Sequence, residues 1–153
     1  MKHGSTFFLK AVICLLALLA AGICTIMIGV ISAGNAGIYL PILFGMLVTS
    51  LPFFFALYQG ILLLRSIDTN TAFSEQSVTA ITYIKYCAGG ISVVYALLMP
   101  YIVYVAEKDD APGAAVLGLV FMVSTLITAV FAAVLEKLLK NALDIKSEND
   151  PTV

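Results

Sequence analysis

The feature that most constrains this chain is a run of 54 residues, 11–64, that contains no Asp, Glu, Lys, Arg or His. Two shorter uncharged segments follow at 86–106 and 111–135. A soluble chain of 153 residues cannot bury so much uncharged sequence, because even a core helix keeps a polar face toward water. About 20 apolar residues are enough to cross the ~30 Å hydrocarbon core of a bilayer. The chain is therefore predicted to be an integral membrane protein.

Composition argues against several classes of function. Hydrophobic residues make up 61% of the chain and charged residues 11%, and the net charge of −1 provides no attraction for nucleic acid. His3 is the single histidine and cannot form a metal site alone. The three cysteines, Cys14, Cys24 and Cys87, occupy apolar segments at unrelated spacings, which is typical of packed side chains rather than ligands. We predict no cofactor, no metal site and no direct contact with nucleic acid.

The uncharged segments divide into four membrane spans. The segment 11–64 is too long for one helix, and the small residues at 32–37 favour a turn inside it. The N-terminus has some features of a signal peptide, but the apolar sequence continues to Ile31, which favours an uncleaved first span. We predict one all-α domain over 1–146, a membrane four-helix bundle of two antiparallel hairpins, and a disordered tail at 147–153. The spans are placed at 7–31, 39–64, 86–106 and 114–135.

The distribution of basic residues predicts the orientation of this bundle. With four spans, the two termini and the connection after residue 64 share one side of the membrane. That side carries seven of the eight Lys and Arg residues, and the other side carries only Lys108. Because cytoplasmic segments are enriched in Lys and Arg, both termini are predicted to lie in the cytoplasm of a cell membrane protein.

The two hairpins also suggest an internal repeat. An offset of 75 residues aligns the basic inner ends of the first hairpin with those of the second, as at Lys10 and Lys85. Duplication of a hairpin, with parallel halves related about the membrane normal, would produce this pattern. Two unrelated hairpins that cross the same bilayer would also have similar lengths and basic ends, so both explanations stay open.

The third and fourth helices are longer than a bilayer requires. Ser74 is a good N-cap for a helix that begins at Glu75, and the fourth helix can continue to Lys146. Two amphipathic extensions, 75–85 and 136–146, are therefore predicted to project into the cytoplasm. They form a candidate partner-docking surface, although such faces also pack on each other or on lipid headgroups. Its candidate residues are Phe73, Val78, Ile81, Leu135, Leu138, Leu139 and Leu143.

The spans contain few side chains that could perform chemistry. Ionisable residues occur only at their cytoplasmic ends, which argues against proton-coupled transport and intramembrane proteolysis. We predict that the chain is not an enzyme and has no catalytic residues. The candidate polar residues at membrane depth are Ser50, Tyr58 and Gln59, which either line a ligand cavity or make hydrogen bonds between helices.

Three short motifs carry a resemblance to a known family. They are Leu-Leu-Arg-Ser-Ile-Asp at 63–68, Ala-Phe-Ser-Glu-Gln-Ser-Val at 72–78, and Leu-Leu-Lys-Asn-Ala-Leu-Asp-Ile-Lys at 138–146. With these motifs the whole chain resembles the YoaS-like family of bacterial membrane proteins, domain of unknown function 2975. The resemblance implies a membrane fold and no established activity. It also implies a genetic association with a small helix-turn-helix regulator of the Cro/repressor type.

These observations lead to two functional hypotheses from different classes. The first is a non-enzymatic sensor or regulatory partner that binds a small cytoplasmic regulator at the helical extensions. The alternative is a small homo-oligomeric transporter, or a membrane self-protection protein, for an apolar or peptide substrate. A cavity lined by Ser50, Tyr58 and Gln59 would favour the alternative. A third reading, a structural subunit of a larger membrane complex, predicts exposed small-residue faces on the fourth helix.

Overall fold

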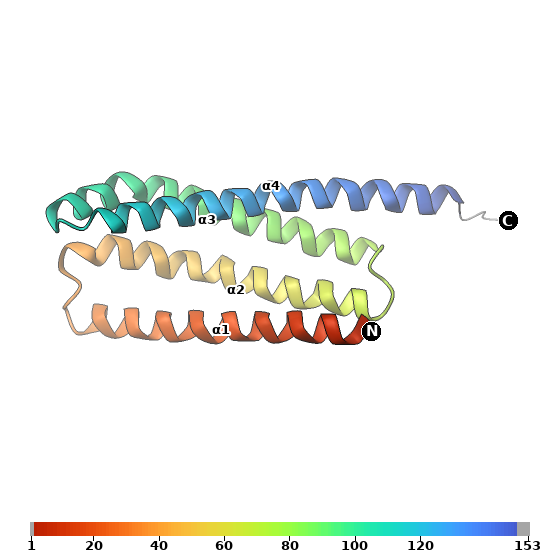
Figure 1. The fold of residues 1–153 in the computed structure, drawn as a ribbon, viewed down its shortest axis with the longest axis horizontal. Coiled ribbons are helices and arrows are strands. Elements are labelled where there is room, and N and C mark those ends of the chain that lie inside the picture. The colour runs from red at the N-terminus through yellow and green to blue at the C-terminus, as the bar shows by residue number, and fades with distance from the viewer. Residues whose placement is uncertain (1, 150–153) are drawn as a thin grey trace.

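A computed structural model of the chain describes residues 2–149, with side chains described from residue 4, and consists of four long α-helices. The described residues contain no strand. All four helices are long and apolar enough to cross a membrane, so the predicted all-α fold with four candidate spans is confirmed. The elements shown in Figure 1 are α1 (Lys2–Ser32), η1 (Gly37–Tyr39), α2 (Leu40–Asp68), α3 (Glu75–Lys108) and α4 (Pro112–Asn149).

The helices end where the local sequence provides a turn. Between α1 and α2 the backbone turns at Gly34 and Gly37, whose φ angles of 71° and 49° are left-handed and favour glycine. Asn70 and Asp110, residue types that tolerate this region, reverse the chain after α2 and α3 with φ of 57° and 50°. Ser74 caps α3, as predicted, because its side chain accepts a hydrogen bond of 3.3 Å from the backbone N–H of Ser77.

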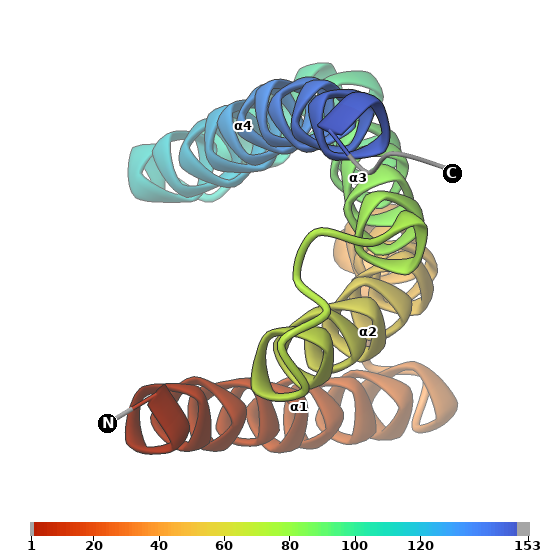
Figure 2. The same cartoon turned by 90° about the vertical axis from the view of Figure 1, so that its right-hand side faces the viewer.

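The four antiparallel helices form an open arc rather than a closed square. Among the described residues, extensive contacts join α1 to α2, α2 to α3 and α3 to α4. Figure 2 shows α1 and α4 at opposite ends of this arc, with its concave side open. Helices α2 and α4 each approach α3 through a glycine: Gly45 of α2 lies against Leu98 of α3, and Gly118 of α4 lies against Ile102 of α3. Small residues at such contacts allow membrane helices to pack closely.

The start of α1, the end of α4 and the α2–α3 connection lie at one end of the molecule, which we call the terminal end (Figure 1). The loops after α1 and α3 lie at the opposite end. At the terminal end α4 extends beyond its neighbours and is helical through Asn149, three residues into the tail for which disorder is predicted. The helix continues because neither Gly nor Pro interrupts the sequence between Gly118 and Pro151. The rest of the predicted tail, 150–153, lies outside the described residues.

Candidate functional site

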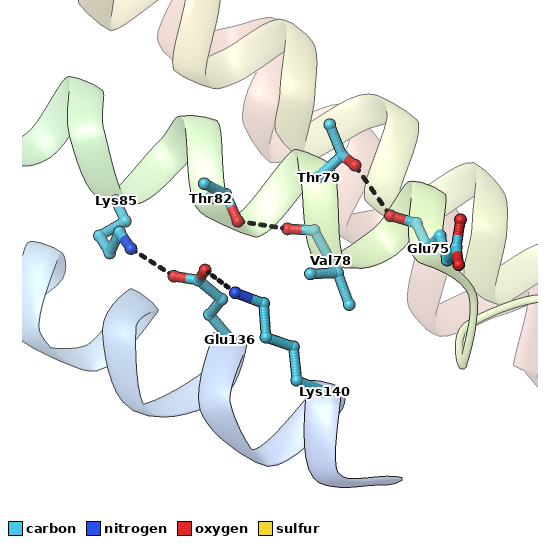
Figure 3. Close-up of polar contacts among 7 residues, drawn as sticks. All are labelled: Glu75, Val78, Thr79, Thr82, Lys85, Glu136 and Lys140. Atoms are coloured by element: carbon cyan, nitrogen blue, oxygen red, sulfur yellow. Dashed lines mark hydrogen bonds and ion pairs between the residues drawn. The ribbon is translucent and has the colours of Figure 1, made fainter. Parts of the chain in front are cut away.

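The charged side chains of the terminal end join α3 to α4 in one cluster. Lys85 of α3 donates a hydrogen bond of 2.5 Å to Glu136 of α4, and Lys140, one turn further along α4, donates one of 2.8 Å to the same carboxylate. Figure 3 shows both lysines directed at Glu136 from opposite sides. Glu136 is buried, with 6% of its surface exposed, so its charge is balanced by partners rather than by water.

The two lysines hold Glu136 in its ionised form. Hydrogen bonds from Lys140 and Lys85 lower the pKa of this carboxyl from 4.5 to about 2, despite the opposing effect of burial. The hydrogen bond to Glu136 in turn raises the pKa of Lys85 above its ordinary value of 10.5. Glu136 and Lys85 are therefore charged at neutral pH, and the cluster joins α3 to α4 at the level of these two residues.

Sequence reasoning missed the role of Glu136, which it treated as the first residue of the extension 136–146. A signal was available, because Lys85 directly precedes one uncharged segment and Glu136 directly follows the next. Antiparallel packing of α3 and α4 brings these ends of the two uncharged segments to the same depth. A second ion pair, between Lys10 of α1 and Asp68 of α2, joins the other two helices at this end. Asp68 is the last residue of α2 rather than part of the predicted connection.

The structure divides the seven predicted docking residues by exposure. Ile81 is buried, with 7% of its surface exposed, and is unavailable to a partner. Three further candidates are half-buried: Val78, Leu139 and Leu143. The remaining three are exposed, and their exposed fractions are 58% for Phe73, 46% for Leu135 and 59% for Leu138. The extensions thus pack partly on each other and leave a smaller apolar surface free.

One groove at the terminal end includes part of this free surface. It has a volume of about 380 Å³ and lies between the α2–α3 connection and the last turns of α4. Its lining residues are Asn70, Phe73, Ala142, Ile145 and Lys146. Ile145 is 58% exposed and was not among the predicted docking residues. Its position seven residues after Leu138, on the same helical face, was the sequence signal that could have identified it.

The structure does not bring the three intramembrane candidates together. Tyr58 points outward and is 57% exposed, whereas Gln59 is buried. Ser50 donates a hydrogen bond of 2.6 Å to the carbonyl oxygen of Leu47 and lines an apolar pocket of about 230 Å³. All four helices contribute side chains to this pocket, but Tyr58 and Gln59 do not. Among residues 4–149, whose side chains the structure describes, no group of three or more His, Cys, Asp or Glu is arranged to hold a metal ion.

Four apolar helices of spanning length define an all-α membrane protein with several spans. The sequence model of the family described as "Protein of unknown function (DUF2975)" matches residues 30–153, and the chain belongs to this family. It is 46% identical over 161 residues to the "Uncharacterized membrane protein YoaS" of Bacillus subtilis (strain 168), and the match covers 100% of both chains. No solved structure matches the chain. The family resemblance read from the sequence motifs is therefore confirmed.

Proposed function

We propose that this protein is a non-enzymatic regulatory protein of the cell membrane, with both termini in the cytoplasm. In this proposal the groove at the terminal end binds an amphipathic helix of a small cytoplasmic regulator. The observation that carries the proposal is the pair of exposed apolar side chains, Phe73 and Ile145, on the two sides of one groove. An exposed apolar surface that faces water is typical of a binding site.

The position of this groove along α4 favours a protein partner over lipid. Ile145 follows Leu135, the last residue of the uncharged segment, by ten residues. At 1.5 Å per residue the helix carries Ile145 about 15 Å beyond the hydrocarbon core. The headgroup layer occupies only about 5–8 Å on each side of the bilayer. Phe73 and Ile145 therefore contact water unless a protein covers them.

The groove also has the chemistry that a helix-in-groove complex requires. Its apolar lining suits the apolar face of a helix, and Asn70 and Lys146 add polar groups to that lining. The Glu136 cluster joins α4 to α3 just before the groove-lining residues of α4 begin at Ala142, which reduces the ordering that partner binding requires. The genetic association implied by the family resemblance makes a small helix-turn-helix protein the regulator to test.

The test is co-purification of the full chain with the helix-turn-helix regulator encoded beside it. The double variant Phe73→Ser, Ile145→Ser removes both apolar side chains of the groove and is expected to weaken binding at least tenfold. Leu138→Ser is the matched control, because Leu138 is 59% exposed on the same helix but does not line the groove. The proposal is wrong if the native chain does not retain the regulator, or if the control weakens binding as much as the double variant.

A specific observation also favours the second candidate function, binding of an apolar or peptide substrate for transport or self-protection. The pocket lined by Ser50 lies where side chains of all four helices meet, and its lining is mostly apolar. Ser50→Phe would fill it, whereas Tyr58→Phe alters an exposed residue outside it. Uptake of an apolar fluorescent peptide into proteoliposomes is expected to fall in the first variant alone. Equal uptake with and without the protein would refute this function.

A further inference from the structure

A second pocket at the terminal end lies beside the Glu136 cluster and is rich in hydrogen-bond donors. It has a volume of about 390 Å³, and its polar lining consists of Lys85, Glu136, Lys137, Lys140, Asn141 and Asp144. Three ammonium groups and two carboxylates give this lining a net charge of +1. The pocket is distinct from the groove of Phe73 and Ile145, with which it shares no lining residue.

The depth of this pocket coincides with the boundary of the bilayer. Lys85 directly precedes the uncharged segment 86–106, and Glu136 directly follows the uncharged segment 111–135. Tyr86 is 67% exposed at the same level, and the Lys85 Nζ lies 4.7 Å from its ring centroid. Tyrosine and lysine are typical of the headgroup level. This depth follows from the uncharged segments and holds for either orientation of the chain.

The ion pairs leave cationic donors free to face the headgroups. Each ammonium has three N–H donors, and Glu136 accepts a hydrogen bond from Lys85 and one from Lys140. Lys140 remains 58% exposed, and Lys137 is also exposed. Asp144 lies one turn beyond Lys140, about 6 Å further from the membrane. Without Asp144, the charged groups of the lining are Lys85, Lys137, Lys140 and Glu136, three positive and one negative, so the net charge nearest the membrane is +2.

At the opposite end of the molecule the pocket lining is acidic rather than basic. The pocket there includes Glu107 and Asp110 in its lining and no lysine. Anionic phospholipids carry a phosphate at the level of their headgroups, and basic pockets between membrane helices bind such groups. We propose that the Lys85–Lys137–Lys140 pocket binds the phosphate of an anionic phospholipid in the leaflet at the terminal end. This inference does not rest on the proposed binding of a regulator.

The test measures lipid binding to the full chain by native mass spectrometry in detergent, with phosphatidylglycerol and phosphatidylcholine as probes. We expect phosphatidylglycerol to bind more tightly than phosphatidylcholine. Lys137→Gln leaves the Glu136 cluster intact, because Lys137 is not part of it. Removal of this one charge is expected to weaken phosphatidylglycerol binding about fivefold. A second variant, Lys140→Gln, is expected to have an effect of similar size, with its folding checked by circular dichroism.

Lys146→Gln is the matched control, since it removes the same charge from the same helix. Lys146 lies nine residues beyond Lys137, about 13 Å further from the membrane and more than one screening length away at physiological salt. We expect it to weaken binding less than twofold. Equal binding of the two lipids, or equal losses in Lys137→Gln and Lys146→Gln, would overturn the proposal. Displacement of phosphatidylglycerol by excess inorganic phosphate would also overturn it, because the site would then select free phosphate rather than lipid.

Discussion

The contact between α2 and α3 at Gly45 allows a quantitative prediction. A Cβ atom at Gly45 would lie 2.3 Å from Leu98 Cδ1, 3.3 Å from Cγ and 3.4 Å from Cδ2. Carbon atoms in ordinary contact are about 3.5–4.0 Å apart, so Gly45→Ala forces the Leu98 methyl group to move by more than ~1 Å. Such overpacking costs about 1–3 kcal/mol, and the higher helix propensity of Ala offsets about 1 kcal/mol of that. We expect Gly45→Ala to lower the free energy of unfolding by about 1 kcal/mol.

A double-mutant cycle separates the clash from the helix propensity. Leu98→Ala removes the side chain that the new methyl group meets, so in that background Gly45→Ala keeps only the favourable propensity. The interaction energy between the two substitutions is therefore expected to be about 1–3 kcal/mol. The assay is equilibrium unfolding in mixed micelles with increasing sodium dodecyl sulfate, followed by circular dichroism, for the four members of the cycle.

Gly60→Ala provides the control within the same helix. A Cβ atom at Gly60 would lie 3.5 Å from Ile13 Cδ1, which is an ordinary contact. This substitution is expected to leave stability unchanged or to raise it by up to about 1 kcal/mol. An interaction energy near zero in the Gly45–Leu98 cycle would refute the reasoning, because α2 and α3 would then not approach each other at Gly45.

Three further predictions follow from the helix contacts, the cluster and the charge distribution. Gly118→Leu should separate α4 from α3 and cost at least about 1–3 kcal/mol in the same assay, because a Cβ atom there already meets Met99 at 3.1 Å. Gly113→Ala is the control and should not destabilise the protein, because nothing lies within 4 Å of a Cβ atom at that position. The pKa of Glu136 is lowered from 4.5 to about 2, so the free energy of unfolding should fall as the pH drops through that range. The pKa of Lys85 is raised above 10.5, so stability should also be lost above pH 10.5, where Lys85 deprotonates. The melting temperature should therefore not change with pH near neutrality, and a change in melting temperature near pH 7 would contradict the assignment of the cluster. Glu136→Gln should lower the melting temperature by several degrees and remove its dependence on acid pH. In a cysteine-free background, an impermeant maleimide should label Asp110→Cys in intact cells and Ser147→Cys only after lysis, and the reverse pattern would show that the termini lie outside.

Parts of the candidate site could be read from the sequence because they depend on local chemistry. Ser74 was predicted as the N-cap of α3 since the pattern of a cap is contained in four residues. Helical spacing was enough to name Leu138 as a candidate docking residue; the structure finds it exposed, and its docking role stays a prediction. The burial of Ile81 and Glu136 could not be predicted, since it depends on the rotation of α3 relative to α4.

The sequence by itself determined that the chain is an all-α membrane protein with four candidate spans, because uncharged length decides which segments a bilayer accepts. The tertiary structure alone decided that the helices form an open arc, that Lys85 and Lys140 share Glu136, and that Phe73 and Ile145 face one groove. The physical reason lies in the solvent. A helix in water shows its packing face as an apolar stripe, whereas a helix in lipid is apolar on every side and carries no such mark. Its neighbours are then selected by close contacts such as those at Gly45 and Gly118, which exist only in three dimensions.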